Sequence, residues 1–226
     1  MDPPAQTLYS GPHDAPSIYS NVAVPMDTMV KKGVPRSLEH LLQLNQLAVR
    51  QKFSVSQGNG RTFDILDPAG QRVYQALQEY QCCGPGYNVK IMDNSEQEVL
   101  DIIEECACTC TRQVQVHSFG GNLLGNVKLH SNFLVTHLSV MDPSKNVVLH
   151  IVGPSFKTNI FGDCSFEVKS SDEQHVVGMF KNESDFLVSF PMDLDVSVKA
   201  LLLGACFFLE SCINTHRVFL TNRKYY

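Results

Sequence analysis

Apolar and polar residues alternate through the middle of the chain, in short runs separated by turn residues between positions 53 and 190. Phe63 and Ile65, with polar residues beside them, form one such run. Alternation with a period of two is typical of β-strands that bury one face. The pattern therefore predicts a mainly β domain.

A unit of strand, turn and strand recurs in this region, at residues 65–73, 91–99, 140–148 and 167–178. In the turn Asp67-Pro68-Ala69-Gly70, proline supplies the φ angle of the second position, while aspartate and glycine suit the first and fourth. Successive hairpins without helical crossovers predict an antiparallel meander. Such a meander loses its exposed edges when it closes into a barrel.

Two segments carry helical spacing instead. Ser37 can cap a helix with helically spaced leucines, and we expect this helix to cover residues 38–51. Ser95 and Glu98 have the spacing of a capping box, which favours a second short helix. The hairpin repeat runs through residues 96–105, however, and we predict a strand there.

The longest apolar run lies near the end of the chain, inside a predicted helix over residues 196–213. It consists of Ala200, Leu201, Leu202, Leu203, Gly204, Ala205, Cys206, Phe207, Phe208 and Leu209. A helix that crosses hydrocarbon needs about 20 consecutive apolar residues, which is more than this run supplies. A helix that is apolar on every face must be surrounded by apolar groups. We therefore predict that the hairpins wrap around this helix, and a bilayer-spanning helix is the alternative.

Composition narrows the classes of function. The chain has 226 residues, a net charge of -5 and a pI near 5.9. Nucleic-acid binding needs clustered Lys and Arg, so no nucleic-acid partner is expected. Residues 1–6 lack the charged and apolar regions of a secretory signal, so we expect a cytosolic compartment. The eight cysteines should then be mostly reduced.

The chain divides into three predicted parts. Residues 1–33 hold five of the eleven prolines and almost no apolar periodicity, so we expect a disordered leader that could dock protein partners. The predicted barrel domain covers residues 34–213 and includes the apolar helix. Residues 214–226 are expected to form a short polar tail.

Several short segments, taken in chain order, resemble the phospholipid scramblase family. They include Gly70-Gln71-Arg72-Val73-Tyr74, Cys82-Cys83-Gly84-Pro85, Ile151-Val152-Gly153-Pro154 and Phe190-Pro191-Met192-Asp193-Leu194-Asp195. The matches are spread over most of residues 34–210. That family is similar in fold to the tubby proteins. The resemblance therefore implies a closed antiparallel, tubby-like β-barrel around the apolar C-terminal α-helix.

The resemblance also implies a function. Members of the family are described as moving phospholipids between leaflets when calcium rises, which implies phospholipid partners and the cytoplasmic face of the plasma membrane. Such movement lowers the barrier for a polar headgroup to cross hydrocarbon and needs no covalent chemistry. A single apolar helix offers no polar groove. If this chain moves lipid, we therefore expect a homo-oligomer or a local perturbation of the bilayer.

The resemblance implies a calcium-binding segment over residues 182–193. Asn182 and Ser184 stand where the family has acids, so we expect calcium binding to be weakened. The acids that remain are Glu183, Asp185, Asp193 and Asp195. The alternative is an acidic turn before a helix N-terminus, where carboxylates are favourable. The family's Trp-containing segment is also missing between Lys181 and Asn182, and the loss of a strand there would open the barrel.

Three closely spaced cysteines align with the family's palmitoylated cluster, namely Cys106, Cys108 and Cys110. The resemblance implies that they carry acyl chains, and about two such anchors are needed for stable membrane residence. On a strand the same spacing would place three thiols on one face, where they could bind a metal. Structural zinc usually uses paired Cys-x-x-Cys, however. Inert thiols are the remaining interpretation.

Histidines do not form a catalytic motif in this sequence. Five of them lie in strand-like segments, namely His117, His130, His137, His150 and His175. No nucleophile elbow, phosphate loop or His-Glu-x-x-His pattern accompanies them. We therefore expect them to be hydrogen-bonded barrel residues.

Three hypotheses follow. The first is a membrane-associated scramblase-family protein with calcium as its trigger. The second is an acylated barrel that binds lipids or proteins without moving lipid itself. The third is a thiolate-metal protein built on Cys106, Cys108 and Cys110.

Overall fold

The structure is a computed structural model that describes residues 36–52, 60–79, 87–104, 112–130, 135–155 and 164–222. The predicted leader over residues 1–33 lies outside this described part of the chain.

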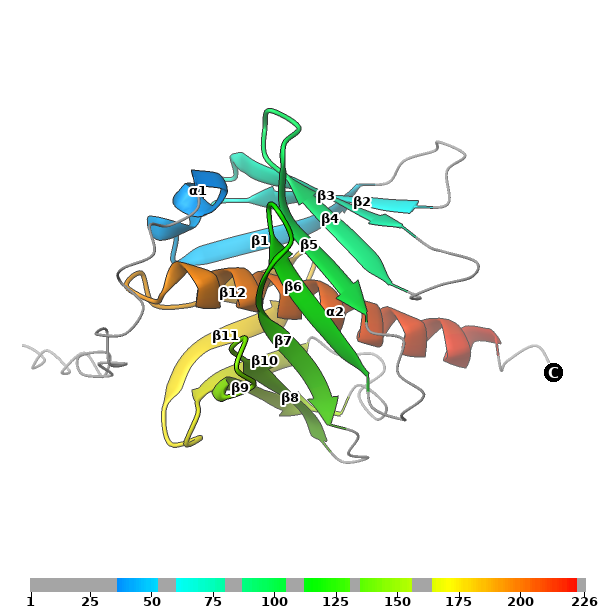
Figure 1. Ribbon diagram of the computed structural model, residues 1–226. Coiled ribbons are helices and arrows are strands. Elements are labelled where there is room, and N and C mark those ends of the chain that lie inside the picture. Colours follow the sequence, from blue (N-terminus) through cyan, green and yellow to red (C-terminus); the bar gives the residue numbers. More distant parts are fainter. Residues whose placement is uncertain are drawn as a thin grey trace, which may run out of the picture. The chain divides into compact units, whose positions relative to one another are not determined.

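Twelve strands within the described residues form a closed antiparallel barrel (Figure 1). Each strand pairs with its neighbours in sequence, and β1 pairs with β12 to close the sheet. The strands are β1 (Gln46–Lys52), β2 (Gly60–Leu66), β3 (Arg72–Glu79), β4 (Asn88–Met92), β5 (Glu98–Glu104), β6 (Gln113–Ser118), β7 (Asn122–His130), β8 (Val135–Met141), β9 (Val147–Pro154), β10 (Cys164–Ser170), β11 (Val176–Asn182) and β12 (Phe186–Ser189). The predicted mainly β, closed antiparallel architecture is confirmed.

Aspartates fix three hairpin turns in the same way. Asp67, Asp93 and Asp142 each accept, through Oδ1, a hydrogen bond from the backbone N–H four residues later, at 2.8, 3.0 and 2.8 Å. The backbone N–H of each aspartate donates in return to the carbonyl oxygen of the residue four positions later, which is Gln71, Gln97 or Asn146. These turns join β2 to β3, β4 to β5 and β8 to β9, so the predicted hairpin repeat is confirmed. The predicted strand within residues 96–105 is β5.

The predicted helix over residues 38–51 is wrong beyond Leu42. The segment instead contains, in order, the 3-10 helix η1 (Arg36–Leu38), the helix α1 (Glu39–Leu42) and most of β1. Leu47 and Val49 are buried, and β1 pairs with β12 on one side and β2 on the other. Pairing with two strands overrides the local helical spacing. Ser37 does not cap α1, because Leu38 occupies the N-cap position without a side-chain hydrogen bond.

The barrel stays closed where the family's Trp-containing segment is missing. β11 ends at Asn182 and pairs directly with β12, where Asn182 lies opposite Phe186. β12 in turn pairs with β1. No open edge results at this point among the described strands.

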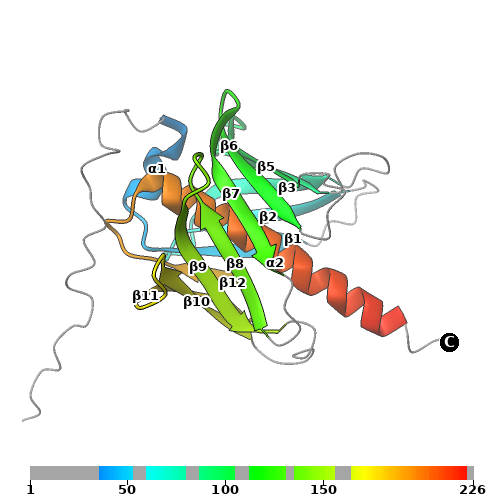
Figure 2. The ribbon, with the colours of Figure 1, turned by 60° about the horizontal axis from the view of Figure 1, so that its bottom comes forward.

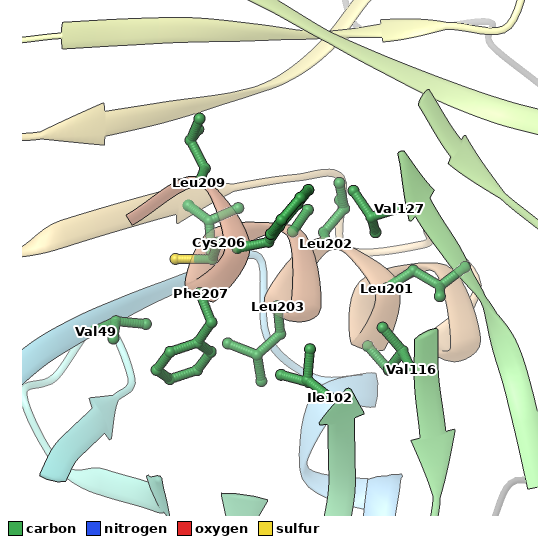
Figure 3. Packing of buried hydrophobic residues seen from close by; sticks show 14 of the residues in the cluster. Val49, Ile102, Val116, Val127, Leu201, Leu202, Leu203, Cys206, Phe207 and Leu209 are labelled. Atoms are coloured by element: carbon green, nitrogen blue, oxygen red, sulfur yellow. The ribbon is translucent and has the colours of Figure 1, made fainter. Parts of the chain in front are cut away.

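The long helix α2 (Val196–Asn222) passes through the middle of the barrel (Figures 1 and 2). Residues 200–209 are all buried. Figure 3 shows Leu201 and Leu203 of α2 packed among side chains of the surrounding strands. The helix continues beyond the predicted end at residue 213, so the first part of the predicted tail over residues 214–226 is helical.

The two ends of the barrel are distinct. At the entry end, β12 leads into the N-terminus of α2 at Val196. At the exit end, α2 leaves the barrel near Glu210, beside Arg61 at the start of β2. Because neighbouring strands run in opposite directions, β5 ends and β6 begins at the exit end.

Gly204 lets α2 approach the barrel wall closely. A Cβ atom built on Gly204 would lie 2.5 Å from Cγ2 of Val116 on β6, which is well inside van der Waals contact. Glycine in a helix interior costs about 1 kcal/mol relative to alanine. Its presence in this buried helix is explained by the close contact with Val116.

We predict that Gly204→Val lowers the free energy of unfolding by about 1–3 kcal/mol, because an overpacked core forces side chains and backbone to shift. Val116→Ala opens space at the same point. The double variant should therefore lose less stability than the sum of the two single variants. Urea unfolding of the purified proteins measures this, and additive losses would contradict the close approach.

Candidate functional site

The location of α2 decides between a membrane helix and a core helix. The segment Val196–Asn214 is long and apolar enough to cross a membrane by length and composition, but most of it is buried inside the protein. The side chains of Leu202, Leu203 and Phe208 are fully buried. In this structure the predicted wrapping of the helix by hairpins is therefore confirmed.

Lys199 is a fully buried charged residue near the start of α2. Its Nζ lies 5.4 Å from the centre of the Phe190 ring. Four backbone carbonyls surround Nζ, at 3.0 Å for Leu41, 3.2 Å for Leu42, 2.8 Å for Leu44 and 2.6 Å for Met192. These carbonyls belong to α1, the segment after it, and the turn before α2. Lys199 therefore ties α1 and the residues just after it to the turn before α2, at the entry end of the barrel.

Two acids act on Lys199 and on the start of α2. Burial lowers the pKa of Lys199, while the nearby carboxylates of Asp193 and Asp195 raise it. Oδ1 of Asp195 also accepts hydrogen bonds from the backbone N–H of Ser197 at 2.8 Å and of Val198 at 3.3 Å. Asp195 is thus a helix cap, as the alternative to calcium binding proposed.

The four acids of the predicted calcium segment form two separate pairs. Glu183 and Asp185 lie in the turn between β11 and β12, where Asp185 forms a two-pronged ion pair with Arg50. Asp193 and Asp195 follow β12, at the entry end. β12 lies between the pairs, and its four residues span about 13 Å. Calcium–oxygen distances are about 2.3–2.6 Å, so one ion does not reach all four carboxylates in this arrangement.

Ion pairs hold α2 at the exit end. Glu210 accepts hydrogen bonds from the guanidinium of Arg61. Arg112 forms an ion pair with Glu104 at 2.6 Å, and its Nη1 lies 3.3 Å from Sγ of Cys212. The strand ends on this side of the barrel are thus bonded to the last buried turn of the helix.

The thiols on α2 are buried and protonated. Burial raises the pKa of Cys206 well above its ordinary value and raises that of Cys212 to about 12, although Arg112 opposes the shift at Cys212. Nucleophilic and metal-binding chemistry requires the thiolate. These two cysteines are therefore packing residues.

The cysteines predicted to carry acyl chains, Cys106, Cys108 and Cys110, lie outside the described residues. The flanking residues are described. Glu104 ends β5, and its ion pair with Arg112 lies just before β6, at the exit end.

Three histidines gather on the outside of the barrel. Nε2 of His137 lies 2.9 Å from Nδ1 of His150, and Nε2 of His130 lies 2.8 Å from Oγ of Ser139. The expectation that these histidines are hydrogen-bonded is confirmed. Within the described residues, His137 and His150 also form, with Glu173, the one group of three side chains placed to hold a metal ion. The sequence did not indicate this group, because only the strand register brings its members together.

The fold places this chain among closed antiparallel β-barrels that enclose an apolar helix. The family described as Scramblase matches residues 24–213, which is most of the chain. The chain belongs to the scramblase family.

Named relatives agree with this assignment. Phospholipid scramblase 2 of Bos taurus is 29% identical over 206 residues, which cover 78% of this chain and 70% of that protein. Phospholipid scramblase 1 of Homo sapiens is 30% identical over 206 residues, covering 78% of this chain and 65% of that protein. Phospholipid scramblase family member 5 of Homo sapiens is 26% identical over 226 residues, covering 87% of this chain and 83% of that protein. No solved structure gives a significant match.

We predict that Lys199→Met lowers the free energy of unfolding by about 1–3 kcal/mol, because methionine leaves buried carbonyls without their donor. Lys181→Met on β11 is the matched control, since Lys181 is exposed. The control should change stability by less than about 0.5 kcal/mol. Urea unfolding followed by circular dichroism measures both. Equal losses of stability from the two substitutions would show that the hydrogen bonds from Lys199 to the four carbonyls do not stabilise the fold.

Proposed function

We propose that this chain takes part in the movement of phospholipids between membrane leaflets, and that α2 stays inside the barrel while it does so. The observation that carries the proposal is the scramblase match over residues 24–213. The relatives are named for phospholipid scrambling. Such movement requires a route along which a polar headgroup avoids bare hydrocarbon. No covalent step is needed for it.

The membrane contact comes, on this proposal, from acyl chains on Cys106, Cys108 and Cys110. A buried α2 contributes no bilayer anchor, so anchoring needs other signals. Two or more acyl chains give stable residence where one gives only marginal binding. A chain acylated in this way would reside on the cytoplasmic face of the plasma membrane. Oligomers of the barrel would then supply the polar route that one barrel lacks.

The proposal includes only a weak response to calcium. The carboxylate of Asp185 is engaged by Arg50, and that of Asp195 caps α2. An ion at either pair would have to compete with these contacts. Calcium should therefore act only at high concentration or through acidic headgroups of the lipid itself.

A second candidate function is favoured by the burial of α2. With residues 200–209 enclosed, the helix presents no surface along which lipid could cross. The chain would then be an acylated barrel that binds lipids or proteins at the membrane without moving lipid itself.

A liposome assay separates the two candidates. Purified full-length protein is reconstituted into vesicles carrying a fluorescent phospholipid, and an impermeant reductant bleaches the outer leaflet. Lipid movement predicts bleaching beyond the outer-leaflet share of the label, with a small increase when calcium replaces a chelator. Bleaching that equals that of protein-free vesicles, with and without calcium, would support the membrane-tethered module instead.

We predict that replacing Cys106, Cys108 and Cys110 together by serine shifts the protein from the membrane pellet to the soluble fraction of lysed cells, because the acyl chains are lost. Neutral hydroxylamine, which cleaves thioesters, should release the unaltered protein in the same way. Pelleting that resists both treatments would rule out acylation as the anchor.

A further inference from the structure

β8 and β9 carry two histidines on the outer surface of the barrel. The neighbouring residues Leu138 and Ile151 are fully buried in the core, so His137 and His150, one position away on each strand, face outward. In the register of this pair, Ser139 lies opposite His150, and His137 is two positions further along β8. The two imidazoles are therefore diagonal neighbours on one face, with ring centres 4.9 Å apart.

A carboxylate from the next hairpin completes the group. Glu173 lies in the turn that joins β10 to β11, and β10 is the neighbour of β9 (Figure 2). Its Oε1 lies 3.8 Å from Nε2 of His137 and 3.8 Å from Nε2 of His150. One ligand atom from each of the three residues lies within 4.8 Å of the others.

We propose that His137, His150 and Glu173 bind a divalent transition-metal ion, with zinc as the best fit. Two imidazole nitrogens and one carboxylate oxygen are a common zinc ligand set, in which the fourth position holds water. Tetrahedral ligands at about 2.0–2.1 Å from zinc are about 3.3 Å apart. The observed 3.8 Å separations close by a small inward movement of Glu173, and the histidines must give up the bond between Nε2 of His137 and Nδ1 of His150. Two nitrogen ligands disfavour calcium and magnesium at this site, since both prefer oxygen.

A second shell is already in position. When Nε2 of His150 binds the metal, its Nδ1 faces Oγ of Ser139 at 3.4 Å. Ser139 in turn lies 2.8 Å from Nε2 of His130 on β7. The N–H of His150 can thus donate to Ser139, and the hydroxyl of Ser139 can donate to His130. Metal-bound histidines usually donate their second N–H to such a partner, which fixes the ring orientation.

The charges around the site permit a bound cation. Lys169 lies opposite His150 in the sheet, and its Nζ is 3.3 Å from the carboxylate of Glu167. Lys128 lies opposite Ser139 and belongs to the neighbouring strand. Glu173 itself brings a carboxylate to the group.

Without metal, a direct bond holds the two histidines together. Nε2 of His137 and Nδ1 of His150 are hydrogen-bonded at 2.9 Å. Zinc would replace this bond with two metal–nitrogen bonds. It would also tie the β10–β11 turn to β8 and β9, which predicts higher thermal stability of the loaded protein.

Binding of Zn²⁺ and Co²⁺ to the full-length protein tests the proposal. Cys106, Cys108 and Cys110 are changed to serine in every sample, which removes the competing thiol cluster. Titration calorimetry should then give one zinc per chain, and zinc should raise the melting temperature. The Co²⁺ complex should show tetrahedral d–d absorption without a thiolate charge-transfer band.

Single substitutions locate the site. His150→Gln and Glu173→Gln should each weaken zinc binding by at least tenfold, and Ser139→Ala by about tenfold. His117→Gln on β6 is the matched control, because His117 is hydrogen-bonded on another part of the barrel. Glu173 lies in a turn and is 46% exposed, so its variant will fold. Zinc binding that is absent, that survives Glu173→Gln and His150→Gln, or that His117→Gln weakens equally would overturn the proposal.

Discussion

The apolar surface of α2 is the constraint on which the rest of the fold depends. A helix that is apolar on every face is unstable in water unless something encloses it, and twelve strands do so here. Each strand must then turn apolar side chains inward, which explains the alternation along the chain. The enclosure must also be tight, and Gly204 permits this where α2 meets Val116. Closure between β1 and β12 completes the wall.

Polar groups fix the helix at both ends of this apolar core. At the entry end the ammonium of Lys199 lies among four backbone carbonyls, and at the exit end Arg61 bonds to Glu210. For α2 to enter a bilayer, these charges would lose their partners and the barrel would lose its core. Either loss costs several kcal/mol or more. The same ten apolar residues that suggest a membrane helix are thus the strongest reason for the helix to remain inside.

Local signals predicted most of this fold, and long-range pairing explains the failures. The hairpins were predictable because Asp67, Asp93 and Asp142 form turns within a few residues of sequence. The apolar helix was predictable from the length of its run. In the predicted helix over residues 38–51, Leu47 and Val49 fit a strand as well as a helix, and only pairing with β2 and β12 selects the strand. The candidate metal group of His137, His150 and Glu173 could not be predicted either, because only strand pairing brings its members together.

The acids of the calcium segment show how a fold changes the meaning of a motif. Along the sequence, Glu183, Asp185, Asp193 and Asp195 are close enough to suggest one loop. The chain between them forms β12, because Phe186 and Val188 are needed to line the core. The strand carries one pair to each end of the barrel. At one end Arg50 binds the carboxylate of Asp185, and at the other the N-terminus of α2 binds that of Asp195. In this arrangement the acids stabilise the closure of β12 onto β1 and the start of α2. A calcium ion at either pair would have to displace the bond from Arg50 to Asp185, or the hydrogen bonds that Asp195 accepts at the start of α2.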